Sequence, residues 1–113
     1  MKIPNDSDGD AMRRVLNNGS DPSNPMDIDF MIACPSIDAA KKIAPKVELI
    51  GYIPSISVDE DSGAITCYCM KHMLLDYDLL IAAQAELDSL AQPHEGYIDG
   101  WGTFGNGPNS KNP

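Results

Sequence analysis

The sequence predicts one α+β domain of the ferredoxin-like type, in which an antiparallel sheet of four strands carries two helices on one face. Three observations predict it. The chain has 113 residues, the size of a single domain. Apolar residues alternate in four segments and recur with helical spacing in two longer ones. After a short leading helix, these segments follow in the order strand, helix, strand, strand, helix, strand.

The N-terminal part of the chain predicts one short helix. Residues 1–9 are polar and are expected to be loose. A helix is predicted over Asp10–Asn18, because apolar residues recur on one face and Gly19 follows as part of a C-terminal cap. The folded domain is expected to span residues 10–105, and residues 106–113 are expected to form a C-terminal tail.

The first strand and the first long helix follow. Alternating apolar residues predict a strand over Ile28–Cys34, which Pro35 ends. Ser36 is a favourable N-cap for a helix that runs to about Ile50. Pro45 lacks an amide hydrogen and clashes one turn back, so a kink or a helix in two pieces is expected there.

The middle of the chain predicts a hairpin. A strand is expected over Tyr52–Val58, and Pro54 places it at an edge of the sheet, because proline cannot donate to a strand ladder. A loop over Asp59–Gly63 leads to a third strand over Ala64–Met70. These two strands are therefore expected to pair.

The last elements are a helix over Asp76–Gln92 and a strand over Tyr97–Phe104. In this topology the two long helices cover one face of the sheet and leave the other face open. Strict alternation along the strands then predicts the residues of the open face, which are Asp29, Met31, Tyr68, Met70, Tyr97, Asp99 and Trp101.

A glycine pattern near the C-terminus resembles a nucleotide-binding turn. Gly100, Gly102 and Gly105 match G-x-G-x-x-G. A dinucleotide site needs a helix and a second strand after this pattern, and the eight residues after Gly105 do not provide them. We therefore interpret the glycines as permitting a bulge, or a close backbone approach, beside Trp101 on an edge strand.

The three cysteines leave two alternatives open. Cys67 and Cys69 are two apart on one strand and share a face, so they could converge with Cys34 on the neighbouring strand. Because Cys67 and Cys69 lie on the face that meets the helices, packing is favoured over a metal or redox site. A structural zinc site also needs a fourth ligand, and His72 is the nearest histidine. No metal, cofactor or catalytic residue is predicted, since nucleophile-elbow, metalloprotease and phosphate-cradle motifs are absent from the sequence.

Charge restricts the partners of the protein. The net charge is −9 and the sequence pI is about 4.3, so a phosphate backbone is repelled and no direct binding of nucleic acid is predicted. No secretory signal and no apolar run of about 20 residues is present, which predicts a cytoplasmic protein without a membrane span. Three cysteines also do not form a fully paired disulfide framework.

The candidate binding residues come from the acidic end of the chain. From His72 through Ser110 there are six acids and no Lys or Arg. An exposed Trp101 rimmed by acids would suit an arginine-rich protein segment, because arginine stacks on tryptophan and pairs with carboxylates. The alternative is that Trp101 is covered by the N-terminal helix or the tail. The candidate protein-binding residues are Asp78, Glu86, Tyr97, Asp99 and Trp101.

Several motifs also resemble a known family. They are residues 16–22 (LNNGSDP), the pair Gly51-Tyr52, the strand with Cys67 and Cys69, and residues 97–103 (YIDGWGT). Together they resemble the RraB family of ribonuclease E inhibitors over roughly residues 11–108. The resemblance implies a ferredoxin-like fold and a cytoplasmic, non-catalytic regulator of RNA turnover. It implies binding to the C-terminal region of endoribonuclease E, which carries arginine-rich segments.

Two other functions stay open at this point. One is a cysteine-based metal-binding or redox protein. The other is a ferredoxin-like binding or dimerisation module with an unrelated partner.

Overall fold

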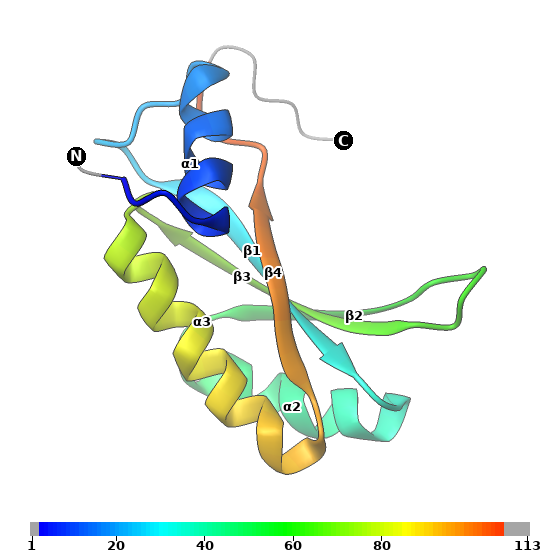
Figure 1. Ribbon diagram of the computed structural model, residues 1–113. Coiled ribbons are helices and arrows are strands. Elements are labelled where there is room, and N and C mark those ends of the chain that lie inside the picture. The colour runs from blue at the N-terminus through cyan, green and yellow to red at the C-terminus, as the bar shows by residue number, and fades with distance from the viewer. Residues whose placement is uncertain (1–2, 108–113) are drawn as a thin grey trace.

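The computed structural model describes residues 3–107 and confirms the ferredoxin-like α+β architecture. A single antiparallel sheet has the strand order β2-β3-β1-β4. Figure 1 shows the arrangement of the elements. In chain order they are α1 (Ser7–Asn17), β1 (Met26–Cys34), α2 (Ile37–Leu49), β2 (Ile53–Val58), β3 (Ile65–Met73), α3 (Tyr77–Ala91), the 3₁₀ turn η1 (Gln92–His94) and β4 (Tyr97–Thr103).

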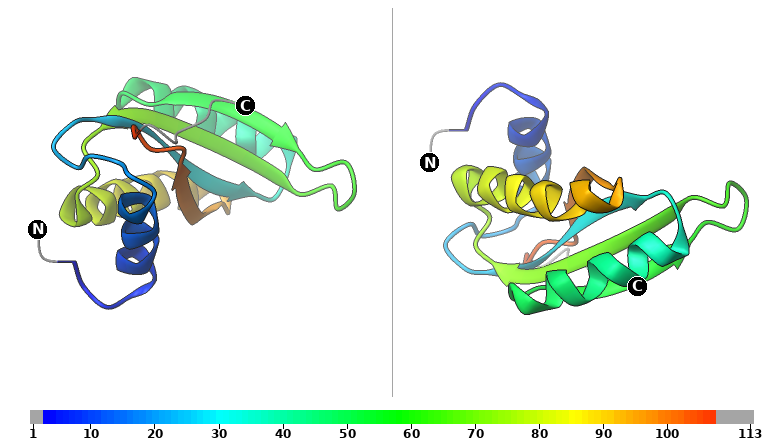
Figure 2. Two further views of the ribbon diagram at one scale, coloured as in Figure 1. Left: turned by 90° about the horizontal axis from the view of Figure 1, so that it is seen from above. Right: turned by 90° about the horizontal axis from the view of Figure 1, so that it is seen from below.

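The two long helices cover one face of the sheet, which we call the helix face. Seen from below, α2 and α3 both lie in front of the strands, whereas from above β2 and β3 lie in front of α2 (Figure 2). Alternate residues of β1 point into the core beneath the helices, and each fully buried side chain of this size contributes about 1.5–3 kcal/mol. The fully buried core side chains include Ile28, Phe30, Ile32, Ile43, Val47, Cys67, Cys69, Leu80 and Leu87.

Side-chain caps set the helix starts. Ser36 Oγ accepts from the Ala39 amide at 3.1 Å, which confirms the predicted start of α2. The third helix begins after Asp76, within one residue of its predicted start. The first helix begins at Ser7 rather than Asp10, because the Asp6 carboxylate accepts from the Gly9 amide at 2.7 Å. Asp6, as an N-cap residue, is the sequence signal that α1 starts before the predicted Asp10.

Pro45 does not divide α2. The helix runs without a break from Ile37 to Leu49, so the expected division into two pieces is wrong. Pro45 and Lys41, the residue one turn earlier, are both exposed. Water can therefore satisfy the carbonyl that loses its intrahelical bond at a proline.

The edge positions of two strands are confirmed. The second strand, which contains Pro54, pairs only with β3, and β4 pairs only with β1. A side chain of α3 also holds β4, because Asp88 Oδ1 accepts from the Ile98 amide at 2.9 Å. Within residues 3–107, no helix has the length and apolar character needed to cross a membrane.

The segment after β4 is fixed to the loop between α1 and β1. The Asn106 side-chain oxygen accepts from the Asp21 amide at 2.7 Å, and its amide nitrogen donates to the Asp21 and Asn24 carbonyls at 3.0 Å each. This contact therefore brings the sequence motif at residues 16–22 next to the segment that follows the motif at residues 97–103. Of the expected tail 106–113, residues 108–113 lie outside the described residues.

Candidate protein-binding surface

The structure places the five candidate residues on two different faces. Asp78 and Glu86 are exposed on α3, two turns or about 12 Å apart along the helix. Tyr97 is opposite Ala33 on β1 and points to the open face, where 56% of its surface is exposed. Because α3 covers the helix face, the sheet lies between these two groups. They do not form one continuous surface.

Trp101 is not on the open face, and its predicted position there is wrong. It is opposite Phe30, a fully buried residue of the helix face. Its indole packs against the core and its Nε1 donates to Asp8 Oδ1 at 2.9 Å. The alternative in which the N-terminal helix covers Trp101 is therefore the observed one.

A β-bulge explains the change of face. Ile98 is opposite Ile32, but Gly100 is opposite Met31, so Asp99 is an extra residue without a partner on β1. One extra residue reverses the alternation for the remainder of the strand. Gly100 has a φ of +137°, which a side chain rarely adopts. The predicted bulge is thus confirmed, and it moves Trp101 to the helix face.

Asp8 joins three elements at the end of the sheet. Its Oδ1 accepts from Trp101 of β4 and also from Gln84 Nε2 of α3, at 3.2 Å. The first helix stands at the end of the sheet where β4 finishes (Figure 1). Sequence reasoning included the covering of Trp101 by the first helix but missed the role of Asp8, because nothing local to Asp8 indicates a partner in a strand near the other end of the chain.

The first turn of α1 extends the acidic side of α3. The Tyr77 hydroxyl donates to Asp6 Oδ2 at 2.5 Å. This hydrogen bond raises the pKa of Tyr77, as do the nearby charges of Asp8 and Asp78. We call this region the acidic α1–α3 surface and define it by Asp6, Asp8, Asp76, Asp78 and Glu86.

Glu86 marks the side of this surface that approaches β2. The Tyr52 hydroxyl lies 3.4 Å from Glu86 Oε1. Burial of Tyr52, together with the Glu86 charge, raises the pKa of Tyr52 to about 12. Exposed apolar side chains also lie along α3, with Leu79 45% and Ile81 38% exposed. The surface therefore offers carboxylates beside apolar contact area.

The open face contains a hollow of about 370 Å³. Asp27 accepts a hydrogen bond across the strands from His72, with Nδ1 and Oδ1 2.9 Å apart. Partial burial and the neighbouring Asp27 raise the pKa of Asp29. The lining residues are Asp27, Asp29, Met31, Tyr68, Met70, Gly102, Thr103 and Phe104. Of the seven predicted open-face residues, Asp29, Met31, Tyr68 and Met70 are among these.

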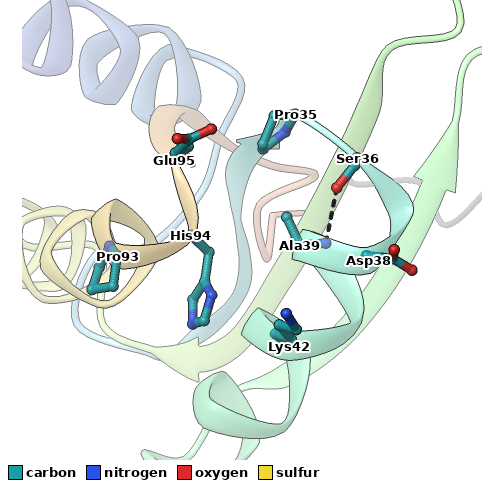
Figure 3. Close-up of a pocket in the computed structure, with 8 residues that line it drawn as sticks. All are labelled: Pro35, Ser36, Asp38, Ala39, Lys42, Pro93, His94 and Glu95. Atoms are coloured by element: carbon teal, nitrogen blue, oxygen red, sulfur yellow. Dashed lines mark hydrogen bonds between the residues drawn. The ribbon is translucent and has the colours of Figure 1, made fainter.

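A second hollow, of about 250 Å³, lies between the start of α2 and η1 (Figure 3). Lys42 and His94 approach it from these two elements, while Asp38 and Glu95 lie at its rim. The Lys46 ammonium lies 2.8 Å from the His94 Nε2. Because a lysine and two acids line this hollow, it is not a site for ligands of one charge alone.

The cysteines lie in and beside the core. Cys67 and Cys69 are fully buried, and Cys34 is half-buried against the same cluster. Burial raises the pKa of Cys34, which opposes formation of the reactive thiolate. Within the described part of the chain, no group of three or more His, Cys, Asp or Glu side chains is placed to hold a metal ion.

Comparison with known proteins identifies the family. A family model described as "Regulator of ribonuclease activity B" (RraB) matches residues 5–103. This chain belongs to the RraB family. The match includes α1 with its acidic first turn, the whole sheet and α3.

Curated relatives carry the same name, Regulator of ribonuclease activity B. The protein from Actinobacillus succinogenes is 32% identical over 105 residues, covering 89% of this chain and 74% of the relative. The protein from Haemophilus influenzae is 33% identical over 100 residues, covering 85% and 65%. The Escherichia coli protein is 26% identical over 104 residues, covering 88% and 75%. The chain thus spans about two thirds to three quarters of these relatives.

Proposed function

We propose that this RraB-family protein regulates a ribonuclease by binding a basic, arginine-rich segment of it through the acidic α1–α3 surface. The partner is an endoribonuclease of the ribonuclease E type, and the regulator itself neither catalyses a reaction nor contacts nucleic acid. A cytoplasmic location belongs to the same proposal.

This proposal rests on the negative charge of α3 and of the first turn of α1 beside it. Carboxylates from the start of α1 and from α3 lie on one side of the molecule, and no Lys or Arg occurs between His72 and Ser110. Opposite potentials accelerate encounter, and arginine forms paired hydrogen bonds with carboxylates. Exposed Leu79 and Ile81 provide apolar area beside these charges.

Within the surface, Asp78 and Glu86 are the proposed contact residues. Both are exposed, and neither caps a helix. Trp101 is left out of the contact surface, because it is packed against α1. Tyr97 lies on the far side of the sheet and lines a hollow there together with Asp99, so these two residues would have to contact a different part of the partner.

Charge reversal tests the proposal. In the double variant Asp78→Lys/Glu86→Lys, binding of a purified ribonuclease E-type C-terminal fragment should weaken at least about tenfold, and added salt should weaken wild-type binding. The matched control is Glu60→Lys/Asp61→Lys, which makes the same change of net charge in the exposed β2–β3 loop. Its affinity should fall much less.

Two results would contradict the proposal. Equal losses in both double variants would mean that net charge alone acts and that the surface is not specific. Unchanged binding in the α3 variant would place the contact elsewhere. Inhibition of RNA cleavage, measured with the same variants, should follow the affinity.

A further inference from the structure

The open face of the sheet is a second, separate surface. The helices α2 and α3 pack on the opposite face, so the open-face side chains of β1 and β3 have no covering layer among the described residues. Ile53 is 62% exposed at one side of this face and Phe104 is 61% exposed at the other. Uncovered apolar side chains of this kind mark contact sites when they adjoin a hollow.

The hollow has an apolar floor and an acidic end. Met31 is opposite Tyr68 in the β1–β3 register, and Asp29 is opposite Met70. On the other side of Asp29 the partner is Gly102, and a side chain placed at Gly102 would meet nothing within 4 Å. The absence of a side chain at Gly102 therefore leaves space directly beside the Asp29 carboxylate.

Among the described residues, no basic side chain pairs with Asp29 at the acidic end. Asp27, on the same face, adds a second negative charge, and His72 is engaged with Asp27. The Lys71 ammonium lies 4.8 Å from the centre of the Tyr52 ring, on the helix face. Within residues 3–107 the structure has no Lys or Arg within ion-pair distance of Asp29.

We propose that this hollow binds the arginine side chain of an apolar protein segment, with the guanidinium on Asp29 and the stem on Met31, Tyr68 and Met70. A planar guanidinium stacks on an aromatic ring while it donates to a carboxylate. The hollow, at about 370 Å³, is at the small end of ligand pockets and fits one or two side chains.

Charge distinguishes this occupant from two others. A second copy of the chain would bring Asp29 near its own counterpart, since the residues that line the hollow include no Lys or Arg to pair with it. A nucleic acid would bring phosphates to the same carboxylates. The proposal does not depend on the acidic α1–α3 surface, which lies on the other side of the sheet.

The six methionines allow a direct test by NMR. In protein labelled with ¹³C at the methionine methyl groups, the probe is the blocked peptide acetyl-Ile-Arg-Ile-amide. Met31 and Met70 line the hollow and should show saturable shifts, whereas the buried core residues Met12 and Met26 serve as internal controls and should not.

Three comparisons give the expected results. The same peptide with citrulline in place of arginine should bind at least about tenfold more weakly, because one charge-assisted interaction is lost. Asp29→Asn should weaken the arginine peptide by a similar factor. The Asp78→Lys/Glu86→Lys variant should bind the arginine peptide as tightly as the wild type does. This result would separate the site at Asp29 from the acidic α1–α3 surface.

Other outcomes overturn the proposal. Equal chemical-shift changes with the arginine and the citrulline peptide would mean that the peptide binds only through apolar contacts with the floor of the hollow. Shifts at Met31 and Met70 that change with protein concentration, without peptide, would assign the face to a second copy. An arginine-peptide affinity that is unchanged in Asp29→Asn would show that the guanidinium does not bind at Asp29.

Discussion

The Trp101 indole and the Asp8 carboxylate, 93 positions apart in the sequence, are joined by a hydrogen bond of 2.9 Å. This bond fixes the first helix to an edge strand of the sheet. Because Asp8 also accepts from Gln84 of α3, a single carboxylate holds three elements together. Within the acidic α1–α3 surface, α1 and α3 are therefore joined by a direct side-chain contact.

Removal of this carboxylate should loosen α1. Asp8→Ala leaves two half-buried donors without their acceptor, so the free energy of unfolding should fall by about 1–3 kcal/mol. Trp101, the sole tryptophan, should emit at longer wavelength as water reaches it. Urea unfolding followed by fluorescence measures both effects.

The control for Asp8→Ala is Asp10→Ala. Asp10 pairs with Arg13 on the exposed side of α1, and such pairs contribute about 0–1 kcal/mol. Equal losses in the two variants would show that helix charge, rather than the bond to Trp101, accounts for the effect.

The bond between Tyr77 and Asp6 should make stability depend on pH. The Tyr77 hydroxyl, followed by the Gly9 amide, lowers the pKa of Asp6. A lowered carboxyl pKa means that the stabilisation is present above the unfolded value, near 3.8, and is lost as the pH falls through the folded value. Tyr77→Phe should therefore lower Tm at pH 7, and the difference should shrink below pH 4.

At high pH, stability should depend on the ionisation of Tyr77 instead of Asp6. The same bond raises the pKa of Tyr77, so its stabilisation is lost as the pH rises through that value, above 10. Thermal unfolding of both proteins across the pH range provides the measurement. A constant difference in Tm from pH 3 to pH 7 would contradict the assignment to Asp6.

Asp29 should reduce stability at neutral pH. Its pKa is raised by burial and by Asp27, so the ionised form is disfavoured in the folded state. The resulting loss of stability is absent below the pKa of Asp29 in the unfolded state and complete above its pKa in the folded state. Asp29→Asn should thus raise Tm at pH 7 and leave it unchanged near pH 3. A lower Tm at pH 7 would show that the carboxylate is stabilised by a partner.

Gly105 should resist replacement more strongly than another glycine with positive φ. Gly105 has a φ of +78°, and an added Cβ would lie 2.1 Å from Ser20 Oγ. Gly63 has a φ of +74° with nothing within 4 Å of its Cβ position. Both alanine variants incur about 1–2 kcal/mol of backbone strain. Gly105→Ala should cost at least about 1 kcal/mol more, measured by urea unfolding. Equal costs would mean that Ser20 moves away freely.

Much of the fold could be predicted from local patterns. Alternation identified β1, and the serine before α2 identified where that helix begins, because both signals act within a few residues. Pro54 indicated an edge strand for the same reason. The open-face positions of Met31, Tyr68 and Met70 followed from alternation in two strands that contain no bulge within their mutual pairing.

The candidate site could be predicted less completely. The acids of α3 were found as a charge pattern, but the contribution of Asp6 and Asp8 depended on where α1 docks. The RraB family was indicated by motifs spread along the chain. The contacts of Asn106 join Asp21, in the first of these motifs, to the segment that follows the last one.

Local patterns along the chain specify the order of helices and strands, the acidity of α3 and the presence of glycines that permit a bulge. The face on which Trp101 lies depends instead on how β4 pairs with β1 in the folded protein. Alternation along one strand is a local property, whereas a bulge exists only as a mismatch between two paired strands. Asp99 has no partner on β1, and that one unpaired position turns the tryptophan from the open face toward Asp8.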